Sequence, residues 1–398
     1  MNQIFKVETI ASDRAKKLIR LTTITGSLNM LLKGQLNFLS SYFEVIGVAS
    51  DFGTGNLEVV SNREGVRTID IQMHREISLW NDVNSLWRLI KLFRKEKPYI
   101  VHANTPKGSL LAMMAAWMTC VPHRIYTVTG LRFETTTGWF RWLLITMERI
   151  TCLCATKVIP EGEGVKNALI RNGVTKKPLK VVLNGNINGV DIEHYSRSVK
   201  ILEEVKSIRE EKDTFNFIFV GRLVKDKGIN ELVKAFLKLL SDYSDIRLYL
   251  VGDLENELDP LDKDVKSNIQ KEKAIVAWGF QLDVRPFFAA SDVLVFPSYR
   301  EGFPNVVLQA GAMELPSIVT DINGCNEIIQ DGINGKIIPP RNEDALYNAM
   351  KWFYEHRNDE VKEMAKRARP MIVERYEQHK VWEALLEEYR SLETDEIS

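Results

Sequence analysis

The sequence predicts an α/β protein with two doubly wound parallel-sheet domains, and three observations lead to this prediction. Short apolar runs rich in β-branched residues, such as Val293–Phe296, are typical of buried parallel strands. These runs alternate with segments of helical periodicity along the whole chain, which favours a parallel sheet with crossover helices. The length of 398 residues suits two domains of ordinary size.

The domain boundary is expected in a loop rich in Asn and Gly, residues 184–191, because such a composition favours turns over regular structure. We therefore predict a first domain over residues 1–190 and a second over residues 191–375. A helix over residues 376–398 is expected to pack back across both.

The predicted elements follow the apolar patterns of the two halves. In the first half we expect strands at residues 18–25, 44–49, 68–71, 99–102 and 124–128, with an amphipathic helix at residues 81–95. In the second half we expect strands at residues 216–220, 246–251, 274–277, 293–296, 317–320 and 336–338, and helices at residues 201–212, 229–240, 342–356 and 359–392.

The loop after the strand at residues 293–296 is the strongest candidate for a binding site. Glu301 and Gly302 lie in this loop, and Pro304 suits the first position of the helix that follows. Such a loop lies at the carboxyl edge of a parallel sheet, where open α/β folds bind ligands. N–H groups of Phe303–Val306, which include Asn305, would suit a phosphate, and Glu301 can accept hydrogen bonds from a polyhydroxylated group. A plain strand–helix unit with a surface acid is the alternative.

A second loop supplies positive charge to the same edge. Gly221, Arg222 and Lys227 follow the strand at residues 216–220, so they are expected near Glu301. Arg offers a planar fork and Lys a mobile point charge, which together suit the two phosphates of a nucleoside diphosphate.

Two glycine-containing segments complete the predicted donor site. Backbone groups of Gly279 and Phe280 could read the edge of a nucleobase. The Gly26–Ser27 turn after the first strand could let a ligand approach the backbone closely, although the G-x-G-x-x-G spacing of a dinucleotide site is absent.

In the first domain, Lys107 and Arg132 both follow predicted strands and could bind a phosphorylated acceptor, or point into solvent. Trp139 and Trp142, with Phe133 and Phe140, alternate with arginines along the next helical segment. Such a helix could rest in a lipid headgroup layer or belong to the core.

Composition limits the possible classes of protein. The 45% of hydrophobic and 27% of charged residues describe a globular protein with ample core, and the four cysteines show no zinc or disulfide pattern. Residues 1–17 lack the apolar core of a signal peptide, and no apolar stretch is long enough to span a bilayer.

The zero net charge hides an asymmetry between the two halves. Residues 1–200 hold 27 Lys and Arg against 16 Asp and Glu, and residues 201–398 hold 26 against 37. The basic half favours contact with an anionic surface, and the cytoplasmic membrane face is preferred to nucleic acid, which would leave the second domain unexplained. A charge bias without function is the alternative.

The segment from Glu301 resembles the signature of retaining glycosyltransferases of family 4, in which two glutamates lie eight positions apart. Gln309 replaces the second glutamate here. The likeness covers nearly the whole chain, and several segments narrow it to bacterial enzymes that extend sugars on undecaprenyl diphosphate for capsule, O-antigen or glycan precursors. These segments are residues 34–35, 75–78, 101–102, 105–107, 130–135 and 188–191.

The resemblance implies the GT-B fold, with two Rossmann-like domains facing a cleft. It implies that Arg222 and Lys227 hold the phosphates of UDP, that Glu301 contacts the donor sugar, and that the position of Gln309 binds the ribose hydroxyls. Residues 302–306 would line the diphosphate and the sugar. The acceptor would lie in the N-terminal domain, and no metal or other cofactor would be required.

The expected function is retaining transfer of a hexose or N-acetylhexosamine from a UDP-sugar to a polyprenyl-diphosphate-linked saccharide, on the inner face of the cytoplasmic membrane. Gln309 lacks the charge that would grip two hydroxyls. Relatives often carry His at the position of Thr129, which is also predicted to face the acceptor, so the obvious protein group for proton transfer is absent. A sugar-nucleotide epimerase or phosphorylase of this fold and a non-catalytic binding subunit are the alternatives.

Overall fold

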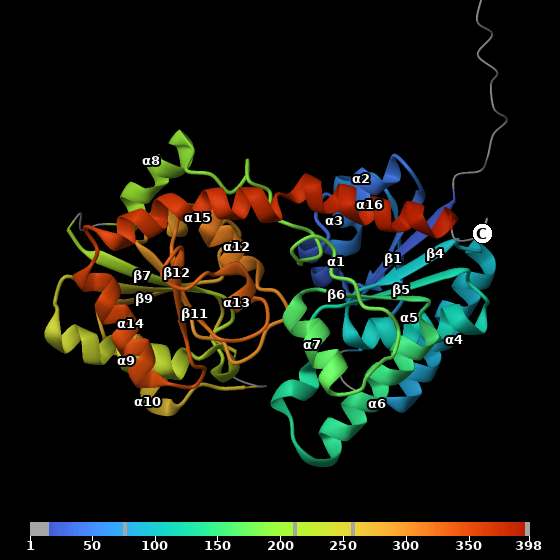
Figure 1. Ribbon diagram of the computed structural model, residues 1–398, viewed down its shortest axis with the longest axis horizontal. Helices are drawn as coiled ribbons and strands as arrows, with labels where there is room; N and C mark the ends of the chain where they lie inside the picture. The colour runs from blue at the N-terminus through green and yellow to red at the C-terminus, as the bar shows by residue number, and fades with distance from the viewer. Residues whose placement is uncertain (1–15, 75–77, 210–212, 256–258, 395–398) are drawn as a thin grey trace, which may run out of the picture. The chain divides into compact units, whose positions relative to one another are not determined.

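The computed structural model describes residues 16–74, 78–209, 213–255 and 259–394, and it contains two six-stranded parallel sheets with flanking helices (Figure 1). The predicted fold class is therefore confirmed. Several predictions fall partly outside the described residues. They concern the N-terminal segment up to residue 15 that was compared with a signal peptide, residues 75–77 of one family segment, residues 210–212 of a predicted helix, and residues 395–398 of the predicted C-terminal helix.

The first sheet has the strand order β3-β2-β1-β4-β5-β6. Its central strands β1 and β4 are almost fully buried, as their continuous apolar sequences require. The strands are β1 (Lys17–Ile24), β2 (Glu44–Ser50), β3 (Arg67–Asp70), β4 (Ile100–Ala103), β5 (His123–Val128) and β6 (Lys157–Pro160). The helices are α1 (Thr25–Leu31), α2 (Gln35–Ser40), α3 (Asn56–Glu64), α4 (Leu79–Glu96), α5 (Pro106–Met118), α6 (Gly138–Cys154) and α7 (Glu163–Arg171), with a 3₁₀ turn η1 (Arg132–Thr135).

The second sheet has the order β12-β11-β10-β7-β8-β9, which places β10 and β7 side by side at its centre. The strands are β7 (Phe215–Val220), β8 (Ile246–Val251), β9 (Ile275–Gly279), β10 (Val293–Phe296), β11 (Ser317–Thr320) and β12 (Gly335–Ile338). The other elements are α8 (Val199–Ile208), η2 (Lys225–Lys227), α9 (Ile229–Asp242), α10 (Lys263–Lys271), α11 (Arg285–Ala289), α12 (Asn305–Ala312), α13 (Cys325–Ile328), α14 (Glu343–Glu355), α15 (Glu360–Tyr376) and α16 (Gln378–Thr394).

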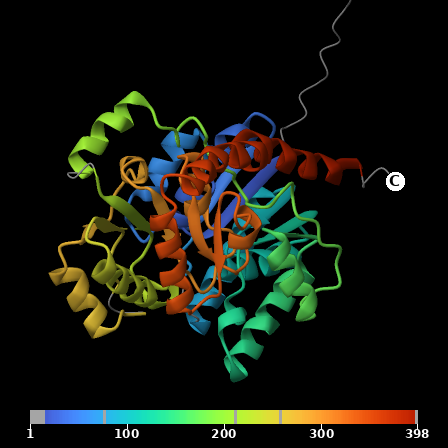
Figure 2. The same cartoon turned by 60° about the vertical axis from the view of Figure 1, so that its left-hand side comes forward.

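Helices cover the second sheet closely and fix the loop that follows β10. Helix α14 packs against α9 and β12, and α15 packs against α12 (Figures 1 and 2). Gly311 permits the close approach of α12 to α15, because a Cβ atom there would lie 2.7 Å from a side-chain carbon of Ile372. The first turn of α12 is therefore held in place by its own helix packing.

Contacts within the chain group the residues into two compact units. One unit contains residues up to Thr127 together with Ile150–Lys157, and the other contains Val128–Arg149 and the residues from Val158 onward. The domain boundaries at residues 190 and 375 stay predictions.

Most predicted elements are observed within a few residues, with two differences. The helical segment predicted at residues 359–392 consists of two helices, α15 and α16, because the backbone of Glu377 (φ −57°, ψ 131°) leaves the helical conformation. The strand β6 was missed, because the apolar periodicity of α6 continues to its edge and the strand itself has only four residues.

Candidate active site

The loop between β10 and α12 holds Glu301 at the carboxyl edge of the second sheet, as predicted. Its carboxylate forms an ion pair with Lys227, and the Oγ atom of Ser298 donates a hydrogen bond of 2.8 Å to Oε1 of Glu301. The side chains of Lys227 and Glu301 are only 18% and 16% exposed. The predicted meeting of a cation with this acid is therefore observed.

Lys227 reaches Glu301 because a glycine lets two loops approach each other. Gly228 has φ of +71°, a left-handed conformation that glycine adopts without strain. A Cβ atom at this position would lie 2.1 Å from the carbonyl oxygen of Pro297. The loop after β7 consequently lies directly against the loop after β10. The Nζ atom of Lys227 also lies 5.6 Å from the centre of the Phe296 ring.

Arg222 lies at the same edge of the sheet but has a different partner. Its Nη1 atom donates a hydrogen bond of 2.6 Å to Glu255, and its side chain is 56% exposed. Gly221, with φ of +148°, directly follows β7 and lies beside Gly252. A Cβ atom added at Gly252 would collide with the carbonyl oxygen of Gly221. Sequence reasoning did not find Glu255, because nothing in its local pattern indicates the pairing.

The remaining predicted donor residues differ in their exposure. Gln309 is half-buried on α12, and among the described residues its side chain has no hydrogen-bond partner. Gly279 has φ of +65°, and Phe280 beside it is 65% exposed, so both remain accessible to a ligand. Phe303 is only 6% exposed and packs against Tyr376 with ring centres 5.5 Å apart.

The positions that follow Glu301 differ in burial. Gly302, Phe303 and Pro304 are buried, whereas Asn305 and Val306 are half-buried. Helix α12 begins at Asn305, one residue later than predicted, and Pro304 precedes it. The N–H groups of a helix's first turn have no intrahelical partner, which suits a phosphate, although that of Val307 donates to the carbonyl oxygen of Pro304 at 3.1 Å.

The segment after β5 lies against Gly302. A Cβ atom on Gly302 would lie 2.3 Å from the carbonyl oxygen of Thr129, and one on Gly130 would lie 3.3 Å from the nitrogen of Gly302. Arg132 is exposed, with its guanidinium 5.6 Å from the centre of the Phe140 ring. Thr129 and Arg132 therefore lie on the segment that adjoins the loop of Glu301.

A buried acid that sequence reasoning missed lies at the same place. Glu161 directly follows β6, is 5% exposed, and has its Oε2 atom 2.6 Å from where a Cβ atom of Gly302 would be. Burial, together with the negative charges of Glu301 and Glu327, raises the pKa of Glu161 well above its usual value. The Glu161-Gly162 dipeptide after a short apolar run was the available signal.

Glu327 of α13 is a second acid that was missed. Its carboxylate accepts hydrogen bonds from the N–H groups of Glu163, Gly164 and Gly324 at 2.6, 3.0 and 3.2 Å. It thereby ties the first turn of α7 to α13. A carboxylate bound by several N–H groups at the start of a helix is a stable arrangement.

Three predicted residues belong to the other unit. Gly26 and Ser27 lie in the first turn of α1, which is a helix where a turn was expected. Lys107 is 9% exposed and forms an ion pair of 2.7 Å with Asp82, so its charge is already compensated within that unit. The roles of these residues in binding a donor or an acceptor stay predictions.

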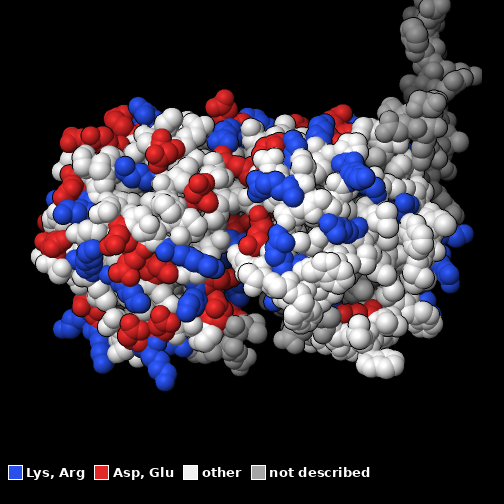
Figure 3. All heavy atoms as spheres, turned by 60° about the horizontal axis from the view of Figure 1, so that its bottom comes forward, with Lys and Arg blue, Asp and Glu red and all other residues white. Residues whose placement is uncertain are grey.

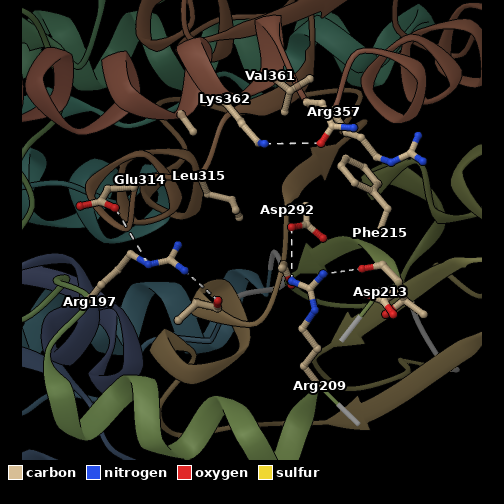
Figure 4. A pocket seen from close by; sticks show the side chains of 15 residues that line it. Arg197, Arg209, Asp213, Phe215, Asp292, Glu314, Leu315, Arg357, Val361 and Lys362 are labelled. Atoms are coloured by element: carbon tan, nitrogen blue, oxygen red, sulfur yellow. Dashed lines mark hydrogen bonds and ion pairs between the residues drawn. The ribbon is translucent and has the colours of Figure 1, made fainter. Parts of the chain in front are cut away.

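A separate pocket of about 310 Å³ lies at the opposite, amino edge of the second sheet, next to the starts of β7 and β10 (Figure 4). Cationic side chains line it, but they have partners in the protein. Arg209 pairs with Asp292 at 3.3 Å, Arg197 donates to the carbonyl oxygen of Ala289, and Lys362 donates to Asn358. The candidate site is assigned to the edge that carries Glu301, because open α/β folds bind ligands at the carboxyl edge of the sheet.

Among the described residues, no group of three or more His, Cys, Asp or Glu side chains is placed to hold a metal ion. No helix in the described part of the chain has the length and apolar character needed to cross a membrane.

Comparisons with known proteins show which family the chain resembles. Residues 214–356 match the family model of glycosyl transferases group 1, and residues 44–185 match that of a glycosyl transferase 4-like domain. The capsular polysaccharide biosynthesis glycosyltransferase CapM of Staphylococcus aureus is 32% identical over 379 residues, which cover 94% of this chain and 97% of CapM.

Two further proteins extend the comparison. An Escherichia coli UDP-Gal:α-D-GlcNAc-diphosphoundecaprenol α-1,3-galactosyltransferase is 31% identical over 290 residues, 69% of this chain and 71% of the relative. The crystal structure of HepE from Anabaena with UDP-glucose has a TM-score of 0.78 at 19% identity and covers 94% of this chain and 99% of HepE, which shows a shared fold. The chain therefore belongs to the family 4 (group 1) glycosyltransferases with the GT-B fold.

Proposed function

We propose that this protein is a retaining glycosyltransferase that moves a hexose or N-acetylhexosamine from a UDP-sugar to a polyprenyl-diphosphate-linked saccharide during cell-surface polysaccharide synthesis. The observation that carries the proposal is the Lys227–Glu301 pair beside the first turn of α12. It combines a cation and free N–H groups for a diphosphate with an acid for sugar hydroxyls. The named activity of the E. coli relative supports the donor and acceptor classes.

In this proposal, positive charge stabilises the leaving nucleotide. Lys227 and Arg222 would compensate the charge that develops on UDP as the sugar leaves, which is usually the largest electrostatic contribution to catalysis. We propose that these two cations and the N–H groups of α12 take the place of a metal ion. Arg222 would have to exchange Glu255 for a phosphate, and its 56% exposure leaves its side chain free to move.

Glu301 would bind hydroxyls of the donor sugar. Its carboxylate keeps one oxygen bound to Ser298 and Lys227, and carboxylates can accept several hydrogen bonds at once. The departing phosphate can itself accept the proton of the acceptor hydroxyl in a retaining transfer. Thr129, which offers no base, is compatible with that route.

We also propose that the protein attaches peripherally to the inner face of the cytoplasmic membrane. Trp139 and Trp142 of α6 are 76% and 65% exposed, whereas the predicted lipid contact Phe133 is 1% exposed and belongs to the core. Figure 3 shows charged side chains of both signs on one side of the visible face and a largely uncharged area at its lower right.

Helix α4 adds a second exposed apolar surface. Leu79, Trp80, Val83 and Trp87 are 79%, 89%, 62% and 55% exposed. Exposed basic residues continue the same helix from residue 88 to residue 95. An apolar surface followed by basic residues suits an anionic lipid surface.

Purified protein should be incubated with a panel of UDP-sugars and a short polyprenyl-diphosphate saccharide, and the products identified by mass and anomeric configuration. We expect one added sugar with the configuration of the donor, and unchanged turnover in the presence of EDTA. Glu301→Gln should reduce transfer far more than UDP binding measured by calorimetry. Inversion of configuration, or an epimerised UDP-sugar without acceptor, would contradict the proposal.

Membrane attachment requires a separate test. The wild-type protein should sediment together with vesicles that contain anionic lipid, and the Trp80→Ser/Trp87→Ser variant should stay in the supernatant. A control with Tyr42→Ser, an exposed aromatic residue outside α4 and α6, should bind like the wild type. Equal binding of all three proteins would contradict the proposed surface.

A further inference from the structure

Three acids lie together here: Glu301 in its loop, Glu327 and Glu161. Of these three, Glu161 alone lacks a compensating partner. Lys227 neutralises Glu301, and three N–H groups bind Glu327. Among the described residues, no hydrogen bond or ion pair involves the Glu161 carboxyl group. A buried carboxylate without a partner is costly, whereas the neutral acid is not.

The position of Glu161 is set firmly by its backbone. Its N–H group donates to the carbonyl oxygen of Val128 at 3.1 Å, and its own carbonyl oxygen accepts from the N–H of Asn186 at 2.8 Å. The side chain is thereby held against Gly302, where any Cβ atom would come within 2.6 Å of Oε2. The absence of a side chain at residue 302 is what makes room for the carboxyl group.

Burial and the neighbouring charged groups set the direction in which the pKa of Glu161 is shifted. Glu301, in the loop after β10, and Glu327, on α13, both disfavour a further negative charge, and burial acts in the same direction. Lys227 is occupied by Glu301. The neighbouring backbone segments contribute Thr129, Gly130, Gly185 and Asn186, none of which is charged. The pKa of Glu161 is therefore raised, which favours the protonated form, an O–H donor.

We propose that Glu161 is a further sugar-contacting residue, which donates a hydrogen bond from its neutral carboxyl group to a hydroxyl oxygen of the donor sugar at Gly302. This inference rests on the proposed function. Glu301 would accept hydrogen bonds from the sugar and Glu161 would donate one. The pair would thus discriminate among sugars by the orientation of a hydroxyl, because a buried donor left without an acceptor disfavours the wrong sugar.

The proposal predicts that substitutions of Glu161 change the KM for the UDP-sugar and leave the affinity for UDP unchanged. A purely structural role would not produce this difference. UDP lacks the transferred sugar, so its affinity should be the same in the wild type, Glu161→Gln and Glu161→Ala. For the UDP-sugar, Glu161→Ala should raise KM about tenfold or more, and Glu161→Gln, which keeps an N–H donor, should stay within about threefold of the wild type. The matched control is Glu163→Gln, an exposed acid two residues away that should behave like the wild type.

The pH profile gives the second measurement. In the wild type, kcat/KM should fall on the alkaline side as Glu161 loses its proton and adds a negative charge beside Glu301. Glu161→Gln cannot ionise and should lack this fall. All variants should first be shown by thermal melting to be folded, and the near-isosteric Gln variant keeps the test valid if Glu161→Ala does not fold.

Each outcome has a definite meaning. An unchanged KM for the UDP-sugar in Glu161→Ala, a Gln variant as impaired as the Ala variant, or the same alkaline fall in Glu161→Gln would overturn the role of Glu161 and leave the proposed function intact. If the wild type binds neither UDP nor any UDP-sugar in calorimetry, the proposed function fails and this inference fails with it.

Discussion

Replacing Gln309 by Glu should strengthen the binding of UDP. Gln309 lies on the second turn of α12, is half-buried, and has no hydrogen-bond partner among the described residues, so the substitution breaks no existing contact. The two side chains are nearly equal in size, and the change adds one negative charge. The ribose hydroxyls would then donate to a carboxylate in place of a carbonyl oxygen.

The magnitude follows from the strength of hydrogen bonds to charged groups. Such a bond contributes about 1.5–3 kcal/mol against about 0.5–1.5 kcal/mol for a neutral one. The difference of about 1–2 kcal/mol corresponds to a Kd for UDP about 5- to 30-fold lower. Partial desolvation of the new carboxylate opposes this gain, so about tenfold is the expected value.

Calorimetry with UDP and with its 2′-deoxy analogue tests the ribose assignment directly. The Gln309→Glu variant should gain most for UDP and less for the analogue, which lacks one of the two hydroxyls. Gln330→Glu adds the same charge at an exposed position of the same unit and should change neither affinity. An unchanged Kd for UDP, or an equal gain for both ligands, would refute the assignment of residue 309 to the ribose.

Three further substitutions probe the same loop. Lys227→Ala should lower kcat about 10²–10³-fold and destabilise the fold by about 2–4 kcal/mol, because Glu301 is left buried without its cation; steady-state kinetics and denaturant unfolding measure the two effects. Gly302→Ala should destabilise the protein by about 1–3 kcal/mol, since the new Cβ atom would lie 2.3 Å from the carbonyl oxygen of Thr129; a melting temperature equal to that of the wild type would contradict this. Glu327→Ala should cost about 2–4 kcal/mol, because three N–H groups lose their acceptor, and hydrogen exchange should be fastest at residues 163 and 164.

The pairing of Lys227 with Glu301 was predictable from sequence because it follows from topology. Both residues lie in loops that follow neighbouring strands of one parallel sheet, and the carboxyl ends of such strands lie at one edge. The strands β10 and β11 were predicted with their observed bounds for the same reason, since buried parallel strands have continuous apolar sequences. Local pattern and global fold agree at these positions.

Side-chain partners that come from unrelated segments were not predictable. Lys107 was expected to bind an acceptor, but Asp82 compensates its charge from a different helix. Glu161 was missed because its proposed role depends on burial against Gly302, which lies 141 positions away in the sequence. The periodicity of apolar residues within a segment does not predict a contact with a distant segment. The structure is therefore needed wherever an acid is perturbed by its surroundings.

The ion pair of Lys227 and Glu301 links the two halves of the proposed donor site. If the diphosphate of the donor attracts Lys227, Glu301 loses part of its compensation and its carboxylate becomes a stronger acceptor for sugar hydroxyls. UDP alone would gain the attraction of Lys227 and leave Glu301 without a partner other than Ser298. The complete UDP-sugar would satisfy both residues at once. Part of the affinity for the sugar would thus come from a charge that the nucleotide exposes, which favours the intact donor over the product UDP.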